Sequence, residues 1–528
     1  MPSTRDANHS VAGSTSKTNA NRSFAWLSVS ILTAAGFAAR LYCLTCKPFW
    51  FDETFSVEVA RVTWGNFLHL LWWREANMSL YYALLRLWLY LGQSPFFIRT
   101  LSAIIATATI PAVYWLARIL YDRRIALIAA ALTAFNAYDV RYAQEARSYA
   151  LFLLLTILSS CFLIRFLRAP NRRNRTAYIL LTTLAVYSHL YALLLLVAQF
   201  LAVRTASIPE AFSAEEHPVS WQVLQAEMRR SWTIIGIAVA PLLVFVAKTG
   251  AGPIRWIHRP GIRDLWAFIE HLAGSDSWQL ATLYGLAVIA AVLGLGNVIR
   301  RRAQTWEVWR CQFLLIWLLF PVVLTVVLSF ARPVFLSRYL IFVLPALLIL
   351  VASGIQRLLR GWLLAPAMAI ILLAEAQGTA FIYTHDFDEE RDASVAAASF
   401  ILDDSQPGDA VIFHIAETRI PYEYVRSMRS GQNTASPKFR EKLGPEIIFP
   451  NHGAGLGYKD FTGKPTADSL RSSLPSHPRV WVMLMNNGTA EEPDPTTVML
   501  TQVLPEMFPR VERWQFTKVE VRLYNRQR

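Results

Sequence analysis

Long apolar stretches separated by short polar ones recur along the chain from Phe24 to about Tyr383. Most of them are close to the roughly 20 residues that a helix needs to cross the hydrocarbon core of a bilayer. This pattern predicts an α-helical polytopic membrane protein with about eleven transmembrane helices. After His385 the pattern changes to charged residues, prolines and short alternating segments. We therefore expect a disordered cytoplasmic N-terminus (residues 1–23), a membrane domain (24–384) and a soluble α/β domain (385–528).

The expected spans can be given one by one. They are Phe24–Leu44, Phe96–Tyr121, Ile125–Ala137, Tyr149–Phe166, Tyr178–Tyr187, Tyr191–Val203, Trp232–Ala247, Leu280–Val298, Gln312–Phe330, Tyr339–Ile355 and Trp362–Tyr383. The apolar segment Leu80–Leu91 is left out because its helix would cover only about 18 Å. It also carries Arg86 in its middle. We expect it to lie in the outer interface of the membrane.

Basic residues cluster after alternate spans, most densely from Arg165 to Arg175 and again at Arg300, Arg301 and Arg302. Because Lys and Arg of short loops stay on the cytoplasmic side, this alternation places the N-terminus inside and the C-terminal domain outside. The net charge of +14 is explained by this topology, so we do not expect a nucleic-acid partner.

Composition supports a membrane protein, since 54% of the residues are hydrophobic and only 17% are charged. Four cysteines are too few for a disulfide framework. Cys43 and Cys46 form a single CxxC pair at the end of the first apolar stretch, and a second pair that could complete a metal site does not follow.

Two adjacent acids, Asp52 and Glu53, stand among aromatic residues in the first outer loop, just beyond the end of a membrane helix. Partial desolvation makes a carboxylate in such a place a stronger base, able to take a proton from a hydroxyl group. The alternative is that both acids merely solvate an interfacial loop.

The second outer loop, Tyr138–Tyr149, holds two acids, two arginines and three tyrosines in twelve residues. Glu145 could position an acceptor or a metal, and Arg147 could neutralise a phosphate through its planar guanidinium group. The alternative is an internal pair between Arg141 and Glu145 that only caps the helix.

Basic residues that lie on the outer face oppose the positive-inside rule and so need another explanation. Lys248 and Arg255 belong to a large outer loop, and Arg338 opens a later helix. An anionic lipid headgroup or a leaving phosphate would explain them, and ordinary anchoring at the interface is the alternative.

Three stretches resemble bacterial family-39 glycosyltransferases of the GT-C superfamily, which are related to protein O-mannosyltransferases and the lipid A aminoarabinose transferase. They are Asn77–Trp88, Arg99–Ala103 and Tyr142–Leu151, and the resemblance covers roughly residues 25 to 385. It implies a GT-C type fold and inverting transfer of a sugar from a polyprenyl-phosphate donor to a hydroxyl of a glycan, lipid or protein acceptor. It also implies a bacterial inner-membrane protein acting on the periplasmic face.

The resemblance also implies roles for single residues. Asp52 would be the general base and Glu53 would complete the acidic pair. Glu145 and Arg147 would face the same cavity, and Arg338 with Tyr339 would lie near the lipid phosphate. Together with residues of the other predicted outer segments, the candidate substrate-binding residues are Asn77, Tyr82, Tyr142, Glu145, Arg147, His189, Lys248, Arg255, Arg338 and Tyr339. Many relatives carry His-Pro-Pro where this chain has Asn77-Met78-Ser79, so a metal or donor role tied to that histidine has no counterpart here. No cofactor is required, and the involvement of a divalent metal is left open.

A transporter or flippase of lipid-linked sugars is the main alternative, because it too would combine many helices with a basic outer surface. Transporters place their sites near the bilayer midplane, often on broken helices in repeated halves. This sequence shows no internal repeat, and its acids gather outside the apolar stretches. In the C-terminal domain, a helix near 390–402 and strands near 410–415 and 480–485 indicate a small α/β fold. We expect this domain to give structural support, and binding of the acceptor is the alternative.

Overall fold

The structure is a computed structural model, in which ten stretches of the chain are described. These are residues 25–204, 221–250, 257–274, 277–296, 306–359, 361–385, 391–430, 444–450, 465–485 and 494–526. The N-terminal segment expected to be disordered lies outside them. The chain packs into two compact units, one formed by Met1–Leu44 and Arg99–Phe387 and the other by Thr45–Ile98 and Asp388–Arg528.

Six helices among the described residues are long and apolar enough to cross a membrane. They are α5 (Pro95–Leu120), α8 (Tyr149–Arg168), α12 (Trp221–Thr249), α16 (Trp306–Ala331), η2 with α17 (Ser337–Val343 and Leu344–Leu358) and η3 with α18 (Gly361–Leu363 and Leu364–Ile382). The chain is therefore a multi-pass integral membrane protein.

Shorter helices occupy the other predicted spans. They are Ala25–Leu41, α6 (Arg123–Phe135), α9 (Arg172–Ser188), α10 (Ala192–Arg204) and α14 (Trp278–Leu293). A helix is thus found at each predicted span, while the number that cross the membrane stays a prediction. Two further helices, α7 (Ala137–Ala143) and α13 (Ile262–Leu272), lie in the loops predicted to be outer.

The third predicted span, Ile125–Ala137, is broken near its end. Helix α6 ends at Phe135, because Asn136 leaves the helical conformation. The Asn136 side chain instead accepts a hydrogen bond from the backbone N–H of Asp139 at 3.1 Å and so begins α7. The chain therefore turns sharply where the polar residues start.

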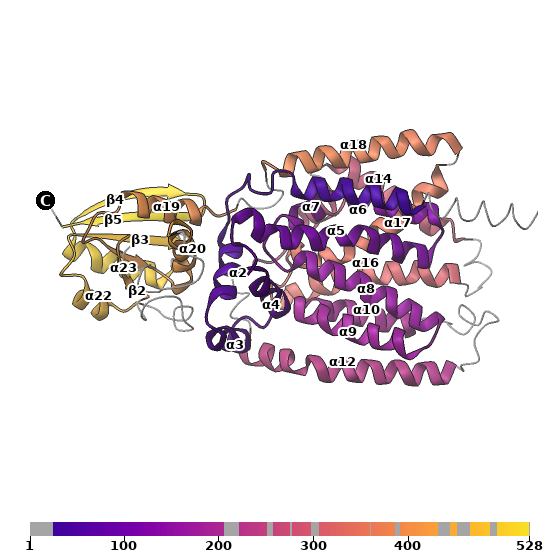
Figure 1. Ribbon diagram of the computed structural model, residues 1–528, viewed down its shortest axis with the longest axis horizontal. Helices are drawn as coiled ribbons and strands as arrows, with labels where there is room; N and C mark the ends of the chain where they lie inside the picture. The colour runs from indigo at the N-terminus through magenta and orange to yellow at the C-terminus, as the bar shows by residue number, and fades with distance from the viewer. Residues whose placement is uncertain are drawn as a thin grey trace, which may run out of the picture. The chain divides into compact units, whose positions relative to one another are not determined.

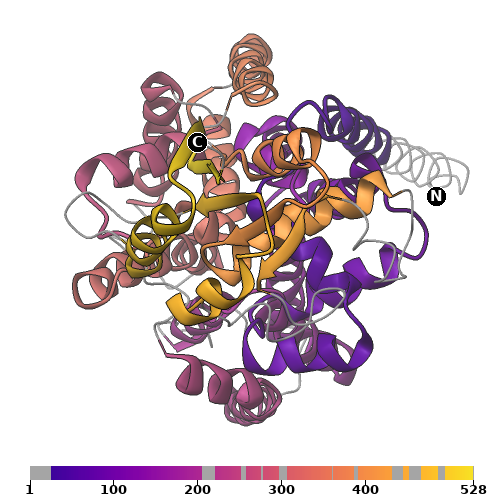
Figure 2. The same ribbon diagram turned by 90° about the vertical axis from the view of Figure 1, so that its left-hand side faces the viewer.

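Close packing and buried polar contacts hold the first unit together. Helix α8 lies against α9, α10 against α16, and α14 against α17 (Figure 1), and Figure 2 shows these helices nearly end-on. Gly354 of α17 has no room for a side chain, since a Cβ would collide with the carbonyl oxygen of Ala287 in α14. Gln199 donates to the hydroxyls of Ser159 and Ser160 at 3.3 and 3.2 Å, a kind of bond that joins helices in lipid.

The second unit combines three helices of the loop predicted to be the first outer one with the C-terminal domain. The loop helices are α2 (Phe51–Arg61), α3 (Trp64–Trp73) and α4 (Ser79–Trp88). The C-terminal helices are α19 (Ser394–Asp404), η4 (Ala416–Thr418), α20 (Arg419–Arg429), α22 (Ala467–Ser473) and α23 (Pro495–Met507). Helix α2 packs against both α4 and α20, so the loop belongs to the packing of the C-terminal domain.

A five-stranded sheet forms the centre of the C-terminal domain, which confirms the predicted α/β fold. Its strands are β1 (Ala410–Phe413), β2 (Glu446–Phe449), β3 (Arg479–Met485), β4 (Arg510–Phe516) and β5 (Val519–Asn525), in the order β2-β1-β3-β5-β4. Strand β1 runs parallel to β2 and β3, while β5 runs antiparallel to β3 and β4.

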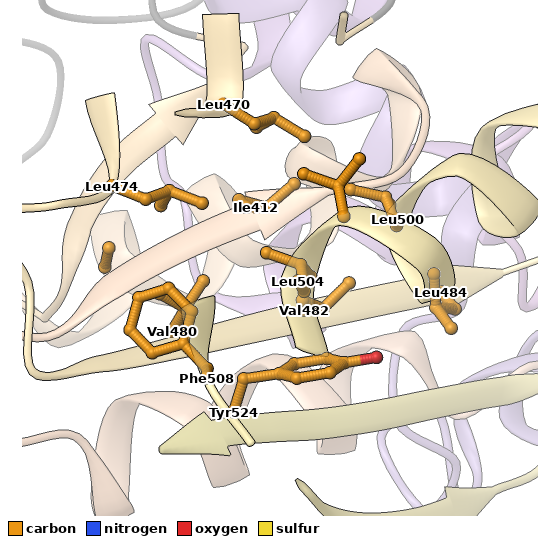
Figure 3. Close-up of a cluster of buried hydrophobic side chains, with 12 residues drawn as sticks. Ile412, Leu470, Leu474, Val480, Val482, Leu484, Leu500, Leu504, Phe508 and Tyr524 are labelled. Atoms are coloured by element: carbon orange, nitrogen blue, oxygen red, sulfur yellow. The ribbon is translucent and has the colours of Figure 1, made fainter. Parts of the chain in front are cut away.

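Side chains alternate between the two faces of this sheet. Val480, Val482 and Leu484 of β3 join a buried cluster with residues of α22 and α23 (Figure 3). Trp481 contacts the opposite layer, where its ring lies 5.9 Å from Phe400 of α19. The domain is therefore a three-layer α/β/α sandwich with an apolar core on one face and an aromatic one on the other.

Candidate functional site

The two acids of the first outer loop occupy the first turn of α2. Glu53 is fully buried, and its Oε2 lies 3.5 Å from Nη1 of Arg391. Asp52 is only half-buried. The pair therefore consists of one carboxylate held inside the protein by a cation and one that keeps part of its surface accessible.

Helix α4 supports the acid-bearing helix. Its Arg86, which the sequence placed in the middle of an apolar segment, donates to the carbonyl oxygens of Ala60 and Val62 at 2.9 and 2.6 Å. These carbonyls end α2, so the guanidinium group serves as a C-terminal cap. Tyr82 is buried on α4, and Asn77 is half-buried just before it.

The second outer loop contributes a line of aromatic rings to the first unit. The ring of Tyr142 lies 5.0 Å from Tyr138 and 5.0 Å from Tyr149. Arg141 and Glu145 do form the i,i+4 pair considered from the sequence, with Nε and Oε1 3.9 Å apart. At that separation the pair is a long one, and it is buried on both sides.

His189 lies at the centre of a second group of residues, in the turn between α9 and α10. Its ring is 4.7 Å from Tyr339 and 5.0 Å from Phe152. Burial, with the positive charges of Arg147 and Arg338, lowers the pKa of His189 from its ordinary value to about 3. The imidazole is therefore neutral at physiological pH.

The hydrogen bonding of His189 also selects its tautomer. Nδ1 accepts the backbone N–H of Tyr191 at 3.2 Å, so the proton of the neutral ring is on Nε2. Nε2 is buried, and no hydrogen-bond partner for it is found among the residues that the structure describes. The ring thus presents an N–H donor beside two guanidinium groups.

Five of the predicted residues are therefore brought together in the first unit, from α7, the connection between α7 and α8, the α9–α10 turn and η2. We call Tyr142, Arg147, His189, Arg338 and Tyr339 the cationic cluster. Tyr142 contacts Tyr149, whose ring lies 6.3 Å from His189. Two guanidinium groups and one N–H donor suit an anion with several oxygens, such as a phosphate.

A buried ion pair near this cluster was not singled out from the sequence. Asp139 of α7 accepts a hydrogen bond from Nη2 of Arg40 at 2.6 Å, and both side chains are almost inaccessible. Arg40 also donates to the carbonyl oxygens of Gly36 and Ala134. The pair fastens the helix Ala25–Leu41 to α7. The signal that could have revealed it is the lone arginine near the end of an otherwise apolar stretch.

The remaining predicted residues do not join these groups. Lys248 is exposed in the last turn of α12, and Arg255 lies outside the described residues. Within the described ranges, no group of three or more His, Cys, Asp or Glu side chains could hold a metal ion. Cys43 and Cys46 are joined in a disulfide, while Cys161 and Cys311 are free and buried.

Comparisons with known proteins identify the fold. No family model and no curated protein matches the sequence. ArnT from Cupriavidus metallidurans in the apo state is 12% identical, with 96% of this chain and 98% of that chain covered and a TM-score of 0.57. ArnT bound to undecaprenyl phosphate is 13% identical, with 94% and 97% covered and a TM-score of 0.54.

A third solved structure is more distant. It is the archaeal oligosaccharyltransferase AglB from Archaeoglobus fulgidus, in complex with an inhibitory peptide and a dolichol-phosphate. It is 10% identical, with 88% of this chain and 69% of that chain covered and a TM-score of 0.51. The chain thus has the GT-C fold, as the resemblance implied, while membership of family 39 stays a prediction.

Proposed function

We propose that the protein is a membrane glycosyltransferase that moves a sugar from a polyprenyl-phosphate donor to an acceptor hydroxyl on the outer face of a bacterial inner membrane. The GT-C fold supports this class of reaction, because solved structures of that fold contain undecaprenyl phosphate in ArnT and a dolichol-phosphate in AglB. The cationic cluster supports a phosphate ligand on independent chemical grounds.

The proposed reaction is a single displacement with inversion at the anomeric carbon. Asp52 takes the proton of the acceptor hydroxyl as its oxygen bonds to the anomeric carbon. The bond from that carbon to the phosphate oxygen breaks, and the polyprenyl phosphate leaves with the electron pair. Arg147, Arg338 and the Nε2–H of His189 would stabilise the negative charge that develops on the phosphate.

One observation supports Asp52 rather than Glu53 as the base. Glu53 is fully buried beside Arg391, whereas Asp52 is half-buried. A general base must come within hydrogen-bond reach of the hydroxyl that it deprotonates. Of the two carboxylates, Asp52 is the one that an acceptor could approach, and Glu53 would help to hold the helix turn in place.

An assay of sugar transfer in proteoliposomes tests the proposal. Wild-type protein would be reconstituted with a panel of polyprenyl-phosphate sugars and assayed beside Asp52→Asn. We expect kcat to fall about 10²- to 10⁴-fold in the variant, because it loses general base catalysis. Asp468→Asn is the matched control, since Asp468 is a fully exposed acid of the same unit. Its activity should equal that of wild type.

Two results would contradict the proposal. Unchanged transfer in Asp52→Asn would remove this residue as the base. Movement of intact lipid-linked sugars across the bilayer, without transfer to any acceptor, would instead favour a transporter or flippase.

A further inference from the structure

The N-terminus of α2 lacks a cap from its own neighbourhood. Trp50 precedes the helix and offers no side-chain hydrogen bond to it. The backbone N–H of Phe51 is bonded instead by the carboxylate of Asp392, with distances of 3.2 and 3.1 Å to its two oxygens. A carboxylate at a helix N-terminus satisfies an otherwise unpaired donor and complements the helix dipole. A residue 341 positions away thus caps the helix that carries Asp52.

The neighbouring Arg391 binds the same helix turn. Its Nη1 lies 3.5 Å from Oε2 of Glu53, and its guanidinium carbon lies 5.9 Å from the centre of the Trp50 ring. A buried carboxylate is costly without a cation beside it. Because Glu53 is fully buried, Arg391 fixes the residue on one side of Asp52 while Asp392 fixes the residue on the other.

Asp392 also lies close to Asp52. Burial raises the pKa of Asp392, and the negative charge of Asp52 adds to the rise. The two acids are therefore near neighbours in space, although they are far apart in the sequence. Two further contacts join the loop to α20. The ring of Phe49 stacks on that of Tyr424, with centroids 5.2 Å apart, and Arg61 donates a hydrogen bond to Ser427 at 2.8 Å.

We propose that Arg391 and Asp392 are positioning residues for the general base, which they orient by clamping the first turn of α2 from both sides of Asp52. This inference rests on the proposed role of Asp52. It gives the C-terminal part of the chain a catalytic task in addition to structural support, because the clamp holds the base at the angle at which it accepts a proton. A shift of the turn would misplace the base without removing it.

Four variants test the clamp in the full-length protein. Asp392→Ala removes both the cap and the charge, so kcat should fall about tenfold while the donor KM changes less than about twofold. Asp392→Asn keeps an acceptor oxygen, so kcat should return to within about threefold of wild type. Arg391→Gln should lower kcat in the same way as Asp392→Ala, and Arg391→Lys, which keeps the positive charge, should restore part of it.

The division between kcat and KM, and the recovery in the conservative variants, distinguish positioning from plain structural support. A misplaced base lowers kcat in the folded protein, whereas a purely structural change would lower the amount of folded protein and leave the kcat of the remainder unchanged. The matched controls are Asp403→Asn and Arg429→Gln, which break an exposed Arg–Asp pair of 2.6 Å in the same domain and should leave kcat unchanged.

The outcomes separate this inference from the proposed function. An inactive Asp52→Asn together with wild-type kcat in Asp392→Ala and Arg391→Gln would overturn the clamp alone. Full activity in Asp52→Asn would overturn the assignment of the base first. If Asp392→Ala does not fold, the pair Arg391→Gln and Arg391→Lys decides, since equal kcat in these two variants also overturns the clamp.

Discussion

His189 is held in one protonation state and one tautomer by its surroundings. Burial and, after it, two guanidinium groups keep the ring neutral, and the backbone N–H of Tyr191 is bonded to Nδ1. A cationic histidine would be a stronger partner for phosphate, but it would titrate near pH 6.5. A neutral donor gives the same hydrogen bond at every physiological pH. The charge needed for phosphate comes instead from Arg147 and Arg338, which do not titrate.

A first prediction follows for this residue. In wild type, the kcat/KM profile should show no inflection from His189 between pH 5 and 8, because its pKa of about 3 lies far below that window. His189→Ala should lower kcat about 10- to 100-fold, the usual value of a hydrogen bond to a charged group. His189→Gln, whose amide N–H reaches about as far as Nε2, should recover part of the loss. An inflection near pH 6.5 that disappears in His189→Ala would contradict the neutral state.

Single residues show what the sequence could and could not reveal. The adjacent acids Asp52 and Glu53 were visible as chemistry, because carboxylates are rare at the end of an apolar stretch. Their different environments were not, since burial of Glu53 depends on Arg391, more than 300 positions away. Arg86 was read as an obstacle to spanning, yet its function as a cap of α2 depends on a contact that no local pattern encodes.

Elements of the membrane part were predictable because apolar length is a local property. Each predicted span contains a helix, and only details such as the break at Asn136 differ. The first outer loop was harder, since α2 and α3 were not expected as helices. Helix α2 has an N-cap without a side-chain hydrogen bond and is stabilised by α4, α20 and Asp392. Tertiary contacts therefore decide its conformation rather than its own sequence.

A second prediction belongs to the scale of elements and concerns the turn before β1. Asp409 accepts hydrogen bonds from Nε and Nη2 of Arg479 at 2.8 and 2.6 Å, and from Nε1 of Trp481 at 2.9 Å. Burial opposes ionisation of Asp409, but these bonds outweigh it and hold its pKa below the ordinary value. The carboxylate thus joins the starts of two parallel strands.

Asp409→Asn should therefore destabilise the C-terminal domain by about 2 to 4 kcal/mol at neutral pH. Since the folded-state pKa is the lower one, this stability is fully present above about pH 4 and is lost as the pH falls through the folded-state value. The difference from wild type should shrink in acid. Protease sensitivity of the full-length protein against temperature measures it, with Asp468→Asn as an exposed control. A difference that persists or grows in acid would rule out this account.

At the scale of the whole molecule, the two ends of the first unit differ in chemistry. Arg40 near the end of the first helix pairs with Asp139 of α7, the helix that precedes α8. Helix α8 then runs to Arg168, at the densest basic cluster of the chain. The Cys43–Cys46 disulfide follows the first helix, at the end where α8 starts. Disulfides persist on the oxidising side of a membrane, and basic clusters stay on the cytoplasmic side.

These two signals agree on one orientation, which accessibility labelling can test. Ser472→Cys in exposed α22 should react with a membrane-impermeant maleimide in intact spheroplasts, whereas Ala169→Cys beside the basic cluster should react only after permeabilisation. The background should be low, because Cys161 and Cys311 are buried and Cys43 and Cys46 are bonded to each other. The reverse pattern would place the C-terminal domain in the cytoplasm. Asp52 packs in the same unit as that domain, so the reverse pattern would also exclude it as a base on the outer face.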